Sequence, residues 1–303
     1  DKLFQFERRF VHLNYSSISL KEYFSKLVGV FGDNAKVGIC FLLATLFRDI
    51  ITGYTKSFPI LNLFGPKGSG KSELGHSLMA LFIIENIPPN IQNATIPALA
   101  DLVAQCANAL VHIDEFKNNI DIDKREYLKG LWDGAGRSRM NMDRDKKREI
   151  TAVDSGVILS GQEMATADIA LFSRLVFLTF AKSEFTEEEK RRYNELVEIR
   201  KRGLTHLTLQ ILRHRARMEQ QFISNYHTCL SDVLEALGAE KVEDRILRNW
   251  IILLAAFRTL EGVLEIPFSY PDIRQVTVDG ILRQNAECKS NNELANFWNV
   301  VSY

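Results

Sequence analysis

One segment of this 303-residue chain restricts its fold more than any other, the sequence GPKGSGKS at residues 65–72. It matches the pattern G-x-x-x-x-G-K-[ST], with an apolar strand predicted over residues 58–64 before it and an apolar helix from residue 71 to about 84 after it. A bare match is expected in about one unrelated chain of this length per hundred, and the flanking elements make an accident much rarer. The pattern predicts the strand, loop and helix unit that starts a parallel sheet.

The loop has the residue types that hold the phosphates of a nucleotide. Glycines let successive backbone N–H groups turn inward, and the helix that starts here adds the positive end of its dipole. We expect Lys71 to reach the β- and γ-phosphates and Ser72 to ligate Mg²⁺, with ATP and Mg²⁺ as cofactors. The alternative is a glycine-rich surface turn. The predicted phosphate-binding residues are Gly65, Pro66, Lys67, Gly68, Ser69, Gly70, Lys71 and Ser72.

A second motif supplies the carboxylates that such a site needs. Asp114 and Glu115 follow a buried strand predicted at residues 109–113. We expect Asp114 to hold Mg²⁺ through water and Glu115 to polarise the attacking water, which favours ATP hydrolysis over phosphoryl transfer to a small substrate. The alternative is a solvated acidic turn. His112 alternates with apolar neighbours, so we interpret it as a core histidine.

The rest of the hydrophobic pattern alternates between short apolar strands and helices, as in α/β proteins with a parallel sheet. We predict five parallel strands with flanking helices and with the nucleotide at the carboxyl ends of the strands. These strands are expected at residues 58–64, 91–95, 109–113, 156–159 and 175–180. The predicted regions are an N-terminal helical region at 1–54, a P-loop ATPase core at 55–182 and a C-terminal helical lid region at 183–303.

This order of elements resembles that of the AAA+ ATPases, P-loop proteins with an additional strand and a catalytic glutamate. The resemblance implies a polar residue after the fourth strand that senses the γ-phosphate, and either Ser160 or Gln162 fits, although the usual asparagine is absent. It also implies an arginine finger before the fifth strand, where Arg174 stands. In AAA+ rings this arginine acts on the nucleotide of the next subunit, which implies a homo-oligomeric ring, with a hexamer expected. The alternative for Arg174 is an ion pair within its own chain.

A basic segment at residues 137–148 precedes the fourth predicted strand and reads as a β-hairpin with a charged tip. It resembles the motor region of superfamily 3-like primase-helicases of phages, plasmids and other mobile elements, in which such a hairpin tracks single-stranded nucleic acid. The resemblance covers roughly residues 55–182. It implies single-stranded DNA as a partner; the alternative is a solvated charged face. The expected phosphate contacts are Arg144, Lys146, Lys147 and Arg148.

Composition limits the other possibilities. Thirty-eight basic and 38 acidic residues give no net charge, so a polyanion must be met at a local site. The longest apolar stretches are about half of the roughly 20 residues that a membrane span needs, so we expect no membrane contact. Four separated cysteines fit a reducing, cytoplasmic setting. The start at Asp1 indicates a piece of a longer protein, in which a primase region could precede the motor.

Two functions from different classes follow. The leading hypothesis is an ATP-hydrolysing ring motor, a replicative DNA helicase that translocates on single-stranded DNA. The alternative is an AAA+ switch that loads or remodels a DNA-bound protein partner without translocation. A small-molecule P-loop kinase is a third reading, but it fits poorly with Glu115 and with more than a hundred residues of helical tail.

Overall fold

The computed structural model describes residues 17–83, 87–140, 148–182 and 186–301, with side chains described outside residues 137–150 and 291–301. Its centre is a parallel sheet of four strands in the order β2-β5-β1-β6. Each strand is nearly continuous in apolar residues because helices cover both faces of the sheet. The strands are β1 (Ile60–Phe64), β2 (Leu110–Phe116), β5 (Gly156–Gly161) and β6 (Leu175–Thr179).

The prediction of a fifth strand at residues 91–95 is wrong. In its place, beside β2, a single parallel bridge joins Asn90 to Asp114. Pro88 and Pro89 lack N–H donors, so a strand cannot extend in that direction. In the other direction the Asn90 carbonyl accepts hydrogen bonds from the backbone N–H groups of Asn93 and Ala94, which turns the chain out of the sheet. The sheet therefore ends at β2.

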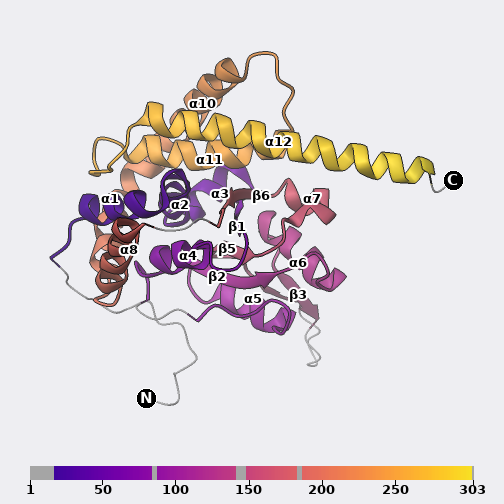
Figure 1. Ribbon diagram of the computed structural model, residues 1–303, viewed down its shortest axis with the longest axis horizontal. Helices are drawn as coiled ribbons and strands as arrows, with labels where there is room; N and C mark the ends of the chain where they lie inside the picture. The colour runs from indigo at the N-terminus through magenta and orange to yellow at the C-terminus, as the bar shows by residue number, and fades with distance from the viewer. Residues whose placement is uncertain (1–16, 84–86, 141–147, 183–185, 302–303) are drawn as a thin grey trace.

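Helices pack on the four-stranded sheet, and two further strands form a separate hairpin. Helix α4 (Lys71–Met79) follows the phosphate loop and packs against β1, β2 and β5. Strands β3 (Arg137–Met140) and β4 (Arg148–Thr151) pair antiparallel, which confirms the predicted hairpin (Figure 1). The remaining helices of this part are α5 (Ile96–Ala104), α6 (Ile122–Trp132), the 3₁₀ turn η2 (Ala165–Ala167) and α7 (Ile169–Phe172).

Among the described residues, three helices precede the sheet: α1 (Leu20–Phe31), α2 (Asp33–Thr45) and α3 (Arg48–Thr55). The apolar run at residues 35–51 is divided between α2 and α3, which are bent by 84°. The bend lets α3 direct Arg48 toward Val153 at the base of the hairpin, where Arg48 Nη1 donates to the carbonyl oxygen. No single helix of the described residues is long and apolar enough to cross a membrane; α2 and α3 reach that length only together, and α2 is buried in the core.

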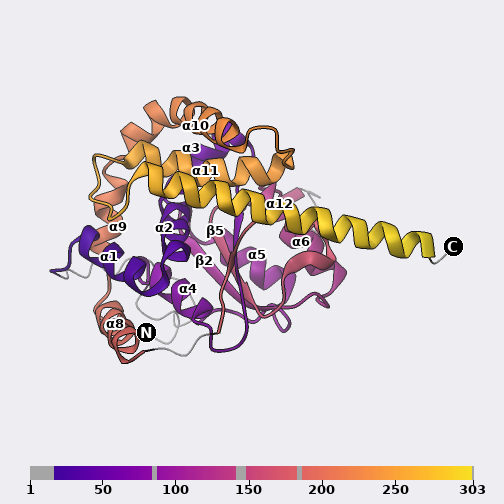
Figure 2. The same ribbon diagram turned by 45° about the horizontal axis from the view of Figure 1, so that its top comes forward.

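The C-terminal part is entirely helical over the residues that are described. Helix α11 packs against α10, α12, α2 and the edge strand β6, so it attaches the helical part to the sheet. Figures 1 and 2 show α10, α11 and α12 along one side of the protein, with the end of α12 extending away from the body. The helices are α8 (Glu187–Arg200), α9 (Thr205–Leu212), α10 (Arg215–Leu237), α11 (Asp244–Leu260) and α12 (Tyr270–Val301).

Candidate nucleotide-binding site

The parallel sheet brings the predicted nucleotide residues to one edge. The phosphate loop, residues 65–72, leaves the carboxyl end of β1, and Leu63 of β1 is in register with Ser160 of the neighbouring strand β5. Asp114 and Glu115 lie near the carboxyl end of β2, on the other side of β5. Because parallel strands all end at the same edge, three motifs that are up to 95 positions apart in the chain face one region.

The phosphate loop has the backbone geometry of an anion cradle. Gly68 and Gly70 have positive φ angles of 80° and 87°, which residues with a Cβ rarely adopt. Within the described part of the chain, five backbone N–H groups of the loop donate to no protein acceptor, so they are available for phosphate oxygens. They belong to Lys67, Gly68, Gly70, Lys71 and Ser72.

Two side chains of the loop are also suited to binding phosphate. Lys71 is only 8% exposed, and its Nζ donates to the Pro66 carbonyl oxygen at 3.3 Å, so the ammonium group is held over its own loop. Ser69 is 7% exposed, and its Oγ has no hydrogen-bond partner among the described residues. A buried hydroxyl normally has a partner, so Ser69 is suited to a bound phosphate or water.

The carboxylate of Asp114 is oriented by two donors. Its Oδ1 accepts from the Ser160 hydroxyl at 2.5 Å and from the Glu115 backbone N–H at 2.8 Å. Glu115 has a positive φ of 61°, a strained conformation for a residue with a Cβ. Its backbone is restrained further by Gln92, whose Nε2 donates to the Glu115 carbonyl at 3.5 Å. Backbone strain of this kind is typical of functional sites, where the surrounding structure maintains it.

These residues fit a magnesium nucleotide. The candidate ligands are the Ser72 hydroxyl and the Asp114 carboxylate, both hard oxygen donors of the kind that Mg²⁺ prefers. Among the described residues, no group of three His, Cys, Asp or Glu side chains could hold a metal by itself. Mg²⁺ is usually bound through one or two carboxylates together with substrate phosphates and several waters.

The structure separates the two candidates for the sensor residue. Ser160 is fully buried at the end of β5 and contacts Asp114, whereas Gln162 is exposed beyond the end of the strand. Ser160 therefore belongs to the hydrogen-bonded network around Asp114. Among the described residues, Gln162 makes no hydrogen bond to that network.

A cavity of about 450 Å³ adjoins the phosphate loop, and no sequence pattern predicted most of its lining. It lies between the α1–α2 junction, the end of β6 and helix α8. Phe31 and Tyr193 supply aromatic surface, and Asn34 Nδ2 donates to the Thr179 carbonyl at 3.0 Å. An apolar cavity with a few polar groups, next to a phosphate loop, suits a nucleotide base and ribose. Its lining comes from four segments that folding brings together, residues 29–34, 68–73, 179–181 and 189–193.

Helix α8 is fastened to α4 beside this cavity. Arg200 Nη2 lies 2.8 Å from Glu73 Oε2, and Arg200 Nη1 donates to Ser77 Oγ at 3.1 Å. Burial tends to raise the pKa of Glu73, but the hydrogen bonds and charge of Arg200 outweigh burial and lower it. Burial raises the pKa of Tyr193 to about 12, with the nearby Glu73 carboxylate acting in the same direction. These contacts hold the cavity wall in a defined position.

Arg174 lies at the opposite edge of the sheet. It immediately precedes β6, while the phosphate loop follows the far end of the neighbouring strand β1, and five strand residues span about 17 Å. Its guanidinium contacts its own chain: Nη2 lies 3.7 Å from the Asp133 carboxylate, and the group stacks over Trp132 at 5.3 Å from the ring centroid. Arg174 therefore cannot reach the phosphate loop of the same chain.

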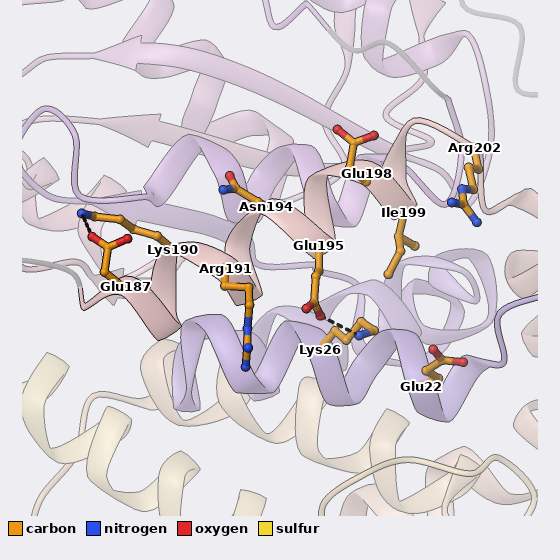
Figure 3. Close-up of a pocket in the computed structure, with 10 residues that line it drawn as sticks. All are labelled: Glu22, Lys26, Glu187, Lys190, Arg191, Asn194, Glu195, Glu198, Ile199 and Arg202. Atoms are coloured by element: carbon orange, nitrogen blue, oxygen red, sulfur yellow. Dashed lines mark hydrogen bonds and ion pairs between the residues drawn. The ribbon is translucent and has the colours of Figure 1, made fainter.

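Another surface hollow, about 720 Å³, lies between α1 and α8 (Figure 3). Its charges are balanced, with four acidic and four basic side chains, and several pair with each other. The Lys26 ammonium lies 3.2 Å from the Glu195 carboxylate, and the Lys190 ammonium lies 2.7 Å from the Glu187 carboxylate. A balanced, self-paired surface offers no net attraction for a polyanion, and the Lys26–Glu195 pair joins α1 to α8.

The predicted nucleic-acid residues are not placed by the structure. Arg144, Lys146 and Lys147 lie outside the described residues. Arg148 is the first residue of β4, and its side chain is outside the described part.

Comparison with known proteins shows the fold. The sequence matches no family model and none of the curated proteins compared with it. The SCCmec type IV Cch protein, an active helicase, is similar over 90% of this chain and 54% of its own, with a TM-score of 0.63 and 15% identity. This chain thus spans about half the length of Cch. A putative ATPase from Cytophaga hutchinsonii matches with a TM-score of 0.44 and 13% identity, over 87% of each chain. The JCV helicase matches with a TM-score of 0.36 and 13% identity, over 71% of this chain and 69% of its own. The chain shares the α/β fold of Cch over the matched region.

Proposed function

We propose that this protein is an ATP-hydrolysing motor that assembles into a ring, with a hexamer expected, and translocates on single-stranded DNA as a replicative helicase of a mobile element. The observation that carries the proposal is the meeting of the phosphate loop, Asp114 and Glu115 at one sheet edge, beside a cavity sized for a base. The fold shared with Cch supports the same motor class.

Each residue has a role in the proposed reaction. The loop N–H groups and Lys71 bind the phosphates, and Ser72 and Asp114 hold Mg²⁺, which neutralises charge on the phosphates when it is bound. Glu115 orients and polarises the attacking water. The 450 Å³ cavity beside the phosphate loop takes the base. These groups lie within one chain, so a single subunit can bind ATP.

In the proposed reaction the γ-phosphate also contacts a cation from a neighbouring subunit. Arg174 is at the opposite edge of its own sheet, so it can stabilise the γ-phosphate only in a neighbouring subunit. In this proposal the ion pair with Asp133 holds Arg174 ready at the subunit interface.

Mixing two inactive variants tests this arrangement. Lys71→Ala cannot bind phosphates and Arg174→Ala cannot complete the neighbour's site, so each alone should be inactive. In a one-to-one mixture, about a quarter of the interfaces pair an intact loop with an intact arginine, and activity should return to about a quarter of the wild-type rate. A mixture that stays inactive, or an Arg174→Ala variant with normal turnover, would contradict a shared site.

The second experiment separates a translocase from a protein-remodelling switch. ATPase activity is measured over a range of protein concentrations, with and without single-stranded DNA, and Lys71→Ala serves as the blank. A rate per subunit that rises with concentration and with DNA supports the ring translocase. A concentration-dependent rate that ignores DNA supports the switch that loads or remodels a protein partner. A rate independent of both would contradict the ring.

A further inference from the structure

We propose that His112 is a positioning residue for the magnesium carboxylate Asp114 and acts through the hydroxyl of Ser160. The inference rests on the proposed ATPase function. His112 is completely buried and stands two residues before Asp114 in β2, so both side chains lie on the same face of the strand. His112 Nε2 lies 2.7 Å from Ser160 Oγ, and Ser160 Oγ lies 2.5 Å from Asp114 Oδ1.

The proton count of this chain of contacts fixes its direction. The Ser160 hydroxyl has one proton, and the ionised carboxylate of Asp114 has none to donate. The 2.5 Å contact with Asp114 therefore requires the Ser160 proton, because two oxygen atoms without a proton between them would repel. Ser160 Oγ is then left as an acceptor for His112, so His112 carries its proton on Nε2 and donates. An N–H donor at this point compels the hydroxyl to point at Asp114.

The imidazole is held in place by the phosphate-loop helix. The ring of His76 on α4 meets the ring of His112 edge to face, with centroids 5.6 Å apart and planes at 73°. A Cβ at Gly75 would lie 2.7 Å from His112 Cε1, so only glycine lets α4 approach the ring this closely. Helix α4 starts at Lys71. His112 thus connects the helix that carries the phosphate-binding residues to the carboxylate that would hold the metal.

As a result, one oxygen of the Asp114 carboxylate is held by hydrogen bonds within the protein. Asp114 Oδ1 accepts from Ser160 and from the Glu115 backbone N–H, which fixes the plane of the group and directs its other lone pairs to Mg²⁺. Groups that orient a metal ligand in this way change metal affinity by about 10- to 100-fold when removed. We expect His112 to act on the affinity for Mg²⁺ and not on the affinity for the nucleotide without metal.

The test measures Mg²⁺-dependent binding of a fluorescent ATP analogue in a Glu115→Gln background, which prevents turnover. His112→Leu removes the donor and keeps similar volume. Its half-saturating Mg²⁺ concentration should rise about 10-fold or more, with unchanged analogue affinity in EDTA. His112→Gln keeps an N–H donor and should stay within about threefold of the parent. Ser160→Ala should reproduce the defect, and adding His112→Leu to it should have no further effect.

The outcomes distinguish the two proposals. A parent protein that does not bind the analogue with Mg²⁺ contradicts the proposed function itself. A parent that binds while His112→Leu keeps normal Mg²⁺ dependence contradicts only the role of His112, as does an additive effect in the double variant. If His112→Leu does not fold, Ser160→Ala and His112→Gln still decide, because normal Mg²⁺ dependence in Ser160→Ala would remove the connection on which the inference depends.

Discussion

Arg200 on α8 binds Glu73 on the phosphate-loop helix α4 twice, through its Nη2 to the carboxylate at 2.8 Å and through its Nη1 to the backbone carbonyl at 3.1 Å. Glu73 lines the cavity beside the phosphate loop, and so does Tyr193, two turns before Arg200 on α8. This pair therefore sets the distance between two walls of the candidate nucleotide site.

Replacing Arg200 should loosen that wall. We expect Arg200→Ala to lower the affinity for nucleotide by about 5- to 10-fold and the free energy of unfolding by about 1–2 kcal/mol, because the pair is mostly buried but not fully desolvated. Nucleotide titration and urea denaturation measure the two effects. Arg202→Ala is the matched control, since Arg202 is exposed two residues later and carries the same charge. Equal effects of both variants would show that general charge, and not the Glu73 contact, is responsible.

The same pair predicts a pH dependence of stability. Burial would raise the pKa of Glu73, but Arg200 outweighs it, so the pKa in the folded protein lies below the ordinary value of 4.5. A carboxylate with a lowered pKa stabilises the fold fully above its unfolded value and loses that contribution as the pH falls through its folded value. The difference in unfolding free energy between wild type and Glu73→Gln should be constant near neutral pH and shrink below about pH 4.5. His76 and Tyr193 also face Glu73. Burial lowers the pKa of His76 and the Glu73 carboxylate raises it, so both proteins are compared in a His76→Gln background that removes this coupling. A difference that grows on acidification would contradict the sign.

Glu115 combines a proposed catalytic role with a strained backbone. Glu115→Gln should bind ATP normally and hydrolyse it at least about 100-fold more slowly, because the amide cannot polarise water. Glu115→Gly and Glu115→Ala should be as inactive, but the glycine variant should be about 1 kcal/mol more stable than the alanine variant, since only glycine relieves the φ of 61°. Single-turnover hydrolysis and thermal unfolding measure the two properties. Normal turnover in Glu115→Gln would remove Glu115 from the mechanism.

The basic hairpin should carry the response to DNA. Changing Lys146, Lys147 and Arg148 to alanine should abolish stimulation of the ATPase by single-stranded DNA and reduce the salt dependence of DNA binding by a log–log slope of about 2, as expected for three lost phosphate contacts. ATPase activity without DNA should remain. The matched control changes three exposed basic residues of the α8 region, Arg191, Lys201 and Arg202. DNA stimulation that survives in the hairpin variant would favour the protein-remodelling switch.

Local signals in the sequence were sufficient for the elements that build the phosphate site. The glycine pattern at residues 65–72 and the apolar strand before Asp114 each depend on neighbouring residues, so their structures follow from local sequence. The hairpin was also predictable, because its strands are close in the chain. The fifth strand was predicted wrongly, because two prolines and the turn at Asn90 prevent residues 91–95 from pairing as a strand and leave one bridge beside β2.

By itself, the sequence determined that this chain has a phosphate loop, a neighbouring pair of carboxylates and an alternating α/β core, because these depend on residue type at short spacing. Only the tertiary structure decided which of Ser160 and Gln162 contacts Asp114, that His112 reaches Ser160, and that Arg200 holds Glu73. Those contacts join residues 46 to 127 positions apart, and their distances depend on strand order and helix packing. No local pattern encodes them, since the same side chains would be an ordinary buried histidine, a strand-ending serine and a surface arginine in another arrangement of the sheet.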